Sequence, residues 1–286
     1  MLHSLDHVIQ AVSDLEPAVG AYARMLGLRP SWRGEHPALG TVNAIFRLEN
    51  TYLELLAPAE GSGQWLRDRI AAQGEGLLGL AFGTDDADAC ARTLSERGLH
   101  PREPEPGIGR DTDSGAFREW TNVHLPPEDT RGVLLFAIEH RTPPEVLARS
   151  TPLFDEASAV RALDHVVVNT KAPDATKALY GGALGLRLAL DREAPQWGAR
   201  MSFFRVGGVT VECVGKLADD IDPAAPDELW GVAWRVPDAE KARARMREAE
   251  IAVSGLRDGR KPGTRVFTVE DGTRGVPTLV IEQGDR

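Results

Sequence analysis

The sequence has few of the residues and patterns that mark membrane, secreted or disulfide-stabilised proteins. Its 286 residues include only two cysteines, Cys90 and Cys213, one in each half, so no disulfide framework is indicated. No apolar run approaches the roughly eighteen residues of a membrane-spanning helix. The first residues form neither a basic nor an apolar segment of the kind found in secretion signals. We therefore expect a cytoplasmic protein with buried thiols and no membrane partner.

Basic residues are fewer than acidic residues. The chain has 33 Lys and Arg against 43 Asp and Glu, which gives a formal net charge of −10. A negative chain repels phosphate backbones and anionic membranes, and no local run of basic residues offsets this. Nucleic acid is therefore not an expected partner. The 42% of apolar residues is typical of a soluble globular protein, and the length predicts two domains.

An internal repeat is the strongest pattern in the chain. Residues 5–54 align without a gap with residues 163–212, at a constant offset of 158, and 15 of these 50 positions are identical. The shared positions include the segment LDHV at 5–8 and 163–166, the segment LGLR at 26–29 and 184–187, and the pair Glu54 and Glu212. A repeat of this length indicates a duplicated structural unit.

Each copy is expected to form a βαβββ unit, because its apolar residues alternate, then recur at helical spacing, then alternate again. The expected elements of the first copy are a strand over 5–12, a helix opened by Ser13 or Asp14 and ended by Gly27, a short strand near 28–32, and strands over 41–48 and 51–56.

Two further stretches resemble these units more weakly. The second unit is expected to contain a strand over 77–82, a helix over 86–97 and a strand over 133–139, and the fourth a strand over 230–236, a helix over 237–249 and a strand over 277–282. A proline-rich segment lies between the halves. We predict an α+β protein with four βαβββ modules in two tandem pairs, divided into a domain over 1–142, a linker over 143–160 and a domain over 161–286.

These segments resemble those of the vicinal oxygen chelate (VOC) superfamily, and within it the glyoxalase-like proteins. The resemblance rests on LDHV at 5–8, LGL at 26–28, His36-Pro37, Gly40-Thr41, Asn43, and the segments 52–55 and 136–140. It implies paired modules that curl into open, cup-shaped mixed β-barrels with helices outside. It also implies a divalent metal inside the cup that chelates two neighbouring oxygens of a substrate. The reaction is not implied, because members include lyases, isomerases, ring-opening dioxygenases and drug-binding resistance proteins.

A histidine and a glutamate recur at the strand positions from which this superfamily takes its metal ligands. They are His7 with Glu54 in the first half and His165 with Glu212 in the second. Both glutamates lie in apolar strands, where a carboxylate costs several kcal/mol unless a cation or hydrogen-bond donors meet it. Imidazole and carboxylate together suit Zn, Mn, Ni or Fe. Strand alternation is expected to put His7 on one face with Leu5, Ile9 and Ala11, and Asp6, Val8 and Gln10 on the other.

The other two units lack metal ligands at the equivalent positions. Gly79 and Phe136 stand there in the second unit, and Gly231 and Leu279 in the fourth. Two ligands in each half are fewer than the three or four of a tight Zn or Fe site. Either units one and three pair, within the chain or across a homodimer, and bring His7, Glu54, His165 and Glu212 together, or His36 or Asn43 completes the first site.

The first half keeps the fuller set of polar and aromatic candidates, since Ala194 and Met201 replace His36 and Asn43 in the repeat. We expect the following substrate-binding residues in the first cup: His36, Asn43, Tyr52 and Trp32. For each of them a purely structural role is the alternative.

Three functions remain open. The first hypothesis is an enzyme, a lyase or isomerase acting on a small substrate with adjacent oxygens, in which His7 and Glu54 are catalytic and Glu54 is a metal ligand or a general base. The alternative is a protein that sequesters a drug or an aromatic metabolite without turnover. A ring-cleaving dioxygenase-like protein is a further alternative.

Overall fold

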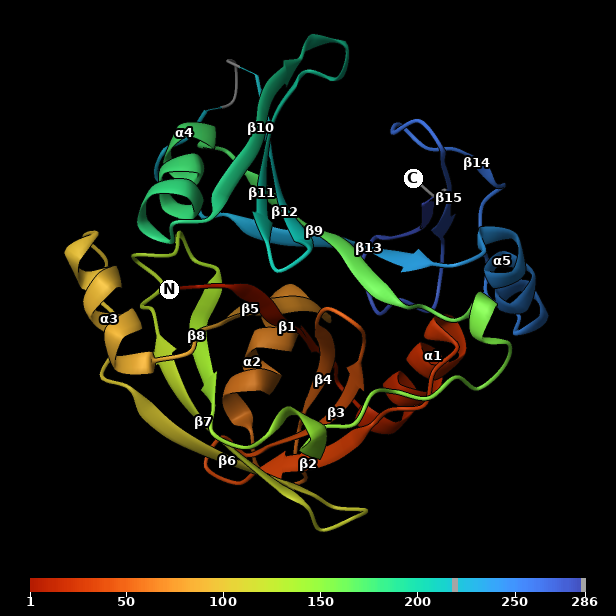
Figure 1. Cartoon of the computed structure of the whole chain (residues 1–286), viewed down its shortest axis with the longest axis horizontal. Helices are drawn as coiled ribbons and strands as arrows, with labels where there is room; N and C mark the ends of the chain where they lie inside the picture. The colour runs from red at the N-terminus through yellow and green to blue at the C-terminus, as the bar shows by residue number, and fades with distance from the viewer. Residues whose placement is uncertain (218–220, 284–286) are drawn as a thin grey trace.

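Two eight-stranded sheets, one from each half of the chain, form the body of the molecule (Figure 1). The computed structural model describes residues 1–217 and 221–283, so the last residues of the expected second domain, 284–286, lie outside the described residues. The α+β class and the two tandem pairs of modules predicted from the sequence are confirmed. Among the described residues, no helix is long and apolar enough to cross a membrane.

The first sheet closes into a barrel with the strand order β1-β4-β3-β2-β6-β7-β8-β5. Its strands are β1 Ser4–Ala11, β2 Trp32–His36, β3 Thr41–Arg47, β4 Tyr52–Pro58, β5 Gly76–Gly83, β6 Glu105–Asp111, β7 Phe117–His124 and β8 Leu134–His140. The two units join through β1 with β5 and through β2 with β6. At the second junction Gly34 pairs with Asp111, and the Asp111 carboxylate accepts a hydrogen bond from the Arg33 backbone N–H at 2.9 Å.

The second sheet has the same arrangement of units but stays open, with the order β10-β11-β12-β9-β13-β16-β15-β14. Its strands are β9 Ala162–Thr170, β10 Arg187–Ala194, β11 Ala199–Val206, β12 Val209–Lys216, β13 Glu228–Val236, β14 Arg257–Asp258, β15 Thr264–Val269 and β16 Thr278–Gln283. Strands β10 and β14 are its two edges, and Figure 1 shows them on separate arms of the second half.

The helices cover the outer faces of the sheets, with one exception. They are α1 Leu15–Leu26, α2 Gln64–Gln73, α3 Ala87–Glu96, α4 Pro173–Lys177 with a π-helical turn over Ala178–Ala183, and α5 Ala239–Glu248. The predicted caps are confirmed for α1, where the Asp14 carboxylate accepts from the Glu16 N–H and Gly27 ends the helix at φ 72°. A single apolar cluster beneath these helices contains residues of both halves, and the two cysteines are buried and unpaired.

The exception is α2, which the sequence analysis did not predict. Its Leu66 is fully buried and packs with Ile9, Leu56 and Phe136, which line the inside of the first barrel. In Figure 1 this helix lies across the ring formed by β1–β8. Because only one of its residues is fully buried, the helix has no apolar stripe that periodicity would reveal.

A β-bulge changes the expected pattern of faces on β1. The register against β5 shifts between Leu5 and His7, so Leu5 packs in the outer apolar cluster while Ile9 and Ala11 point into the barrel. The expectation that Leu5 shares the face of His7 was therefore wrong. The second half has a register shift at the equivalent place, opposite Leu163 and His165.

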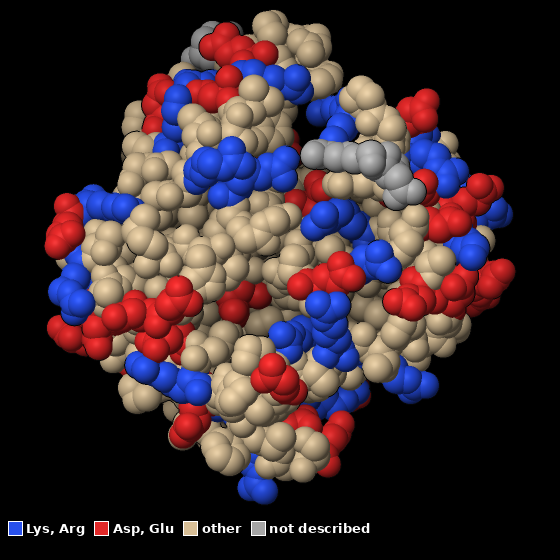
Figure 2. Space-filling model, in the orientation of Figure 1, with Lys and Arg blue, Asp and Glu red and all other residues tan. Residues whose placement is uncertain are grey.

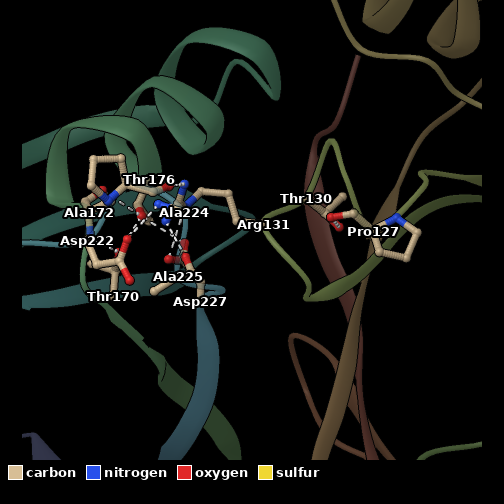
Figure 3. Close-up of polar contacts among 11 residues, drawn as sticks. Pro127, Thr130, Arg131, Thr170, Ala172, Thr176, Asp222, Ala224, Ala225 and Asp227 are labelled. Atoms are coloured by element: carbon tan, nitrogen blue, oxygen red, sulfur yellow. Dashed lines mark hydrogen bonds and ion pairs between the residues drawn. The ribbon is translucent and has the colours of Figure 1, made fainter.

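Polar contacts connect the two halves at a distance from either cup. Asp227, whose side chain is fully buried, accepts hydrogen bonds from Arg131 Nε at 3.1 Å and from Thr176 Oγ1 at 2.8 Å. Arg131 also donates through Nη2 to the carbonyl of Ala225 at 2.8 Å (Figure 3). Since Arg131 lies in the loop between β7 and β8, the network ties the first barrel to the segment that leads into β13.

Removing one partner of this network should destabilise the protein strongly, because a buried charge is left without its partner. We expect Asp227→Ala to lower the free energy of unfolding by about 3–5 kcal/mol in urea denaturation. Glu49→Ala is the control: its partner Arg161 is half exposed, and the loss should stay within about 1 kcal/mol. Equal losses in the two variants would contradict this role of Asp227.

Candidate functional site

The repeated histidine and glutamate meet in both halves. In the first barrel His7 Nε2 lies 3.5 Å from Glu54 Oε2, and in the second sheet His165 Nε2 lies 3.7 Å from Glu212 Oε2. Each pair joins the first strand of its half to the parallel last strand of the same unit. The register also places Phe136 opposite Ala81 and Leu279 opposite Ala233, so the units without ligands carry apolar residues there.

An aspartate before each histidine completes the group. Asp6 accepts a hydrogen bond from His7 Nδ1 at 2.7 Å, and Asp164 accepts one from His165 Nδ1 at 2.9 Å. The bulge turns Asp6 toward the imidazole, although strand alternation predicts the opposite face. This role of Asp6 and Asp164 was not predicted from the sequence, although the repeated Asp-His pair is a signal of it. With Nδ1 occupied, Nε2 is the nitrogen that faces the glutamate.

Asp6 also accepts a hydrogen bond from His140 Nε2 at 2.8 Å. Burial by itself would raise the pKa of this carboxyl group and is the largest single influence on it. The hydrogen bonds from His140 and His7 together outweigh burial and hold the pKa of Asp6 far below its usual value.

The interior of the first barrel around His7 and Glu54 is filled with side chains. Glu54 Oε1 accepts a hydrogen bond from Asn43 Nδ2 at 2.6 Å, and Tyr52 stacks on the His7 ring with centroids 4.5 Å apart. The side chains of His7 and Glu54 are only 4% and 10% exposed. A buried guanidinium, Arg118, lies over the rings of Trp32, Tyr52 and Trp120.

The substrate-binding candidates of the first half all lie in or beside this interior. Trp32, Asn43 and Tyr52 are buried, and the Asn43 Oδ1 atom has no hydrogen-bond partner among the described residues. The strands expected near 28–32 and over 41–48 leave His36 between them, but it ends β2, where Nδ1 lies 3.3 Å from Thr41 Oγ1 and the ring meets the edge of Trp120. A hollow of about 670 Å³ at the barrel rim reaches Asn43 but is not lined by His7 or Glu54.

The second half holds an open cavity of about 900 Å³ that is lined by His165 and Glu212. Thr210 stands where Tyr52 covers the histidine in the first half, and Met201 stands where Asn43 binds the glutamate. In the described part of the segment between β12 and β13, no helix corresponds to α2. These differences leave the His165 and Glu212 side chains 19% and 16% exposed.

The environment of Glu212 in this cavity raises the proton affinity of its carboxyl group. Burial raises the pKa of its carboxyl group, and the nearby positive charges of His165, Arg260 and Arg192 only partly offset this. A carboxylate with a raised pKa facing a cavity is typical of a general base.

The His, Cys, Asp and Glu side chains that the structure describes do not assemble a complete metal site within the chain. Across residues 1–217 and 221–283, no three His, Cys, Asp or Glu side chains converge closely enough to hold a metal ion. The four-residue set of His7, Glu54, His165 and Glu212, one of the two alternatives, is therefore not formed within one chain, because each pair belongs to its own sheet. Asp6 and Asp164 are engaged by the Nδ1 atoms of His7 and His165, so the repeated pair supplies only one imidazole nitrogen and one carboxylate in each half, fewer than the three or four ligands of a tight site.

Family models match both halves of the chain. The glyoxalase-like domain matches residues 5–161, and the glyoxalase/bleomycin resistance protein/dioxygenase superfamily matches residues 164–268. The chain therefore belongs to the VOC superfamily as a glyoxalase-like protein with two tandem domains. Members of this superfamily often use divalent metals.

Solved structures with the same fold cover the whole chain. A triple mutant of 4-hydroxymandelate synthase from Streptomyces coelicolor has a TM-score of 0.66 and 16% identity, over 100% of this chain and 94% of that one. A hypothetical protein from Staphylococcus aureus has a TM-score of 0.65 and 12% identity, over 99% and 100%. A fusion of a xylose isomerase-like TIM barrel with 4-hydroxyphenylpyruvate dioxygenase has a TM-score of 0.64 and 13% identity, over 100% and 49%. No curated protein matches the sequence.

The low pKa of Asp6 predicts a pH-dependent contribution to stability. A carboxyl group whose folded pKa lies below its unfolded pKa stabilises the fold above the unfolded value, near 4, and this contribution fades as pH falls. We expect Asp6→Asn to lower the free energy of unfolding by about 2 kcal/mol at neutral pH, and the difference from the wild type to shrink in urea titrations below about pH 4. Asp85→Asn, at a 96% exposed side chain, should show no such dependence; a pH-independent loss in Asp6→Asn would contradict the assignment.

Proposed function

We propose that this protein is an enzyme that moves a proton on a small substrate with adjacent oxygens, and that its active cavity is the open cup of the second half. The observation that carries the proposal is the placement of His165 and Glu212 side by side on the wall of a 900 Å³ cavity. Proton transfer of this kind belongs to an isomerase or a lyase, the reaction classes favoured from the sequence.

Glu212 is the proposed base. Its carboxylate would take a proton from the carbon next to a substrate carbonyl and return it to a neighbouring carbon or to a leaving group. The burial that raises the pKa of Glu212 makes its carboxylate a better proton acceptor than an exposed one. His165 Nε2 is placed to contact the substrate oxygen on which negative charge develops, and Asp164 holds the ring in that orientation.

We propose that small molecules do not reach the equivalent pair of the first half. His7 and Glu54 have the same geometry but lie among Tyr52, Asn43 and Phe136 inside a barrel that α2 crosses. A catalytic role for them, expected from the sequence, requires this packing to open. The predicted substrate contacts of Trp32 and His36 depend on the same opening.

Sequestration without turnover is the second candidate function. Two observations favour it. Gly231 and Leu279, which cannot bind a metal, occupy the ligand positions of the fourth unit, and apolar residues make up much of the cavity wall. A cup with only two chemically active side chains holds a small molecule as readily as it converts one. The two functions differ in whether carbon-bound protons of the ligand exchange with solvent.

Proton exchange in D₂O tests the proposed function directly. Small hydroxyketones, 2-oxo acids and catechols are incubated with the full chain, and the loss of carbon-bound proton signals is followed by NMR. We expect Glu212→Gln to slow exchange by about 100-fold or more, whereas Glu54→Gln, the same change in the sealed barrel, should leave it unchanged. For the wild type, exchange should rise with pH as the Glu212 carboxyl group loses its proton, and this dependence should disappear in Glu212→Gln. Exchange that is equally fast in both variants, or binding with no exchange, would refute the enzyme.

Metal titration tests whether each half has too few metal-binding side chains for a tight site. With two donors in each half, we expect Zn, Mn, Ni and Fe to bind the metal-free chain only weakly, with dissociation constants above the micromolar range by calorimetry. His165→Ala should remove what binding there is in the second half, and His7→Ala what there is in the first. Stoichiometric tight binding that both variants abolish would instead indicate the four-residue set across a homodimer.

A further inference from the structure

The chain as a whole is acidic, but most of the charged residues that line the open cavity are cations. Its lining includes the acids Asp164 and Glu212 and five cationic residues, Arg192, Arg205, Arg257, Arg260 and Lys261. These residues are spread over about 70 positions of the sequence, which is why no local basic run predicts them. The fold alone brings them together.

The cations come from two arms that are far apart in the sheet. Arg192 and Arg205 belong to β10 and β11 at one edge, and Arg257 belongs to β14 at the other. Arg260 and Lys261 follow β14 in the loop toward β15. Figure 2 shows Lys and Arg side chains on both sides of the hollow between these arms.

One direct contact crosses from arm to arm. The Arg260 guanidinium lies 3.8 Å from the centre of the Trp197 ring, and Arg192 lies 5.8 Å from it on the first arm. Trp197 is 46% exposed, so its ring is open to the solvent beside both cations. A cation–π contact of this kind holds the arms near each other without neutralising either charge.

None of these five cations forms an ion pair with an acidic residue among the described residues, although the acids of the chain are in excess. The two acids of the lining have other partners, Glu212 in His165, and Asp164 in His165 and in Gln283 at 2.6 Å. Like charges gathered at one opening repel each other, and an anion placed among them relieves this repulsion.

We propose that the second cup selects anionic small molecules and holds their carboxylate or phosphate group between Arg192 on one arm and Arg260 and Lys261 on the other. Guanidinium groups bind both anions with paired hydrogen bonds. The apolar wall, which includes Val167, Phe203 and Leu279, takes the body of the ligand, and its adjacent oxygens meet His165 and Glu212. The inference rests on the proposed function for the position of the site and adds the substrate class.

Calorimetric titration of the full chain tests the selection with four probes of similar size: benzoate, phenyl phosphate, benzamide and benzyl alcohol. We expect at least one anionic probe to bind at least about tenfold more tightly than both neutral probes, and its affinity to fall as salt is added. Tighter binding of phenyl phosphate than of benzoate assigns a phosphate ester, and the reverse assigns a carboxylate.

The double variant Arg192→Gln/Arg260→Gln should weaken binding of the preferred anion by at least about tenfold. Arg247→Gln on α5 is the control, because it removes one exposed positive charge away from the cavity and should leave the affinity unchanged. Neutral probes that bind as tightly as anions, undiminished binding in the double variant, or no anion binding at millimolar concentration would each overturn the proposal.

Glu212→Gln separates this inference from the proposed function. The variant removes a negative charge from the cavity, so anionic probes should bind it at least as tightly as they bind the wild type. Retained anion binding with no proton exchange in the wild type supports the anion site and refutes the enzyme. Proton exchange on neutral substrates without anion binding supports the enzyme and refutes the anion site.

Discussion

The contact between a carboxylate and an imidazole on neighbouring parallel strands is the feature on which the rest of the site depends. A glutamate buried in apolar β-structure is costly unless a donor or a cation meets it, and in both halves a histidine does so. A β-bulge beside each histidine brings the preceding aspartate onto the other ring nitrogen. Duplication of the chain has thus duplicated a group of three residues, and the two copies have come to lie in different surroundings.

The surroundings decide what each copy can do. In the first half aromatic rings and Asn43 fill the barrel, α2 packs Leu66 against its inner residues, and pairing of β2 with β6 closes it. In the second half smaller or less polar residues stand at the same positions, and the sheet stays open between β10 and β14. The same triad is therefore part of a packed interior in one half and part of a cavity wall in the other. The two halves nonetheless share one apolar cluster, so the sealed barrel also supports the open cup.

Much of the fold follows from the sequence because the repeat is local and regular. The units, the fold class and the two His–Glu pairs could be predicted from three features of the repeat. These are the LDHV segments, the helix that ends at Gly27 and the paired glutamates. What could not be predicted depends on contacts between distant residues. The bulge at Asp6 is set by pairing with β5. Helix α2 has a single fully buried residue, Leu66. The cations of the cavity lining come from two arms of the sheet. The sequence therefore indicated two His–Glu pairs that the structure brings together, but it favoured the half in which the pair is sealed.

The central claim is that small molecules reach His165 and do not reach His7. The most direct measurement follows the ring-proton NMR signals of these two histidines, assigned with His7→Gln and His165→Gln, while the preferred anionic probe is added to the full chain. We expect the His165 signals to shift and saturate with the binding curve while the His7 signals stay in place. Shifts of the His7 signals with those of His165 unchanged would contradict it.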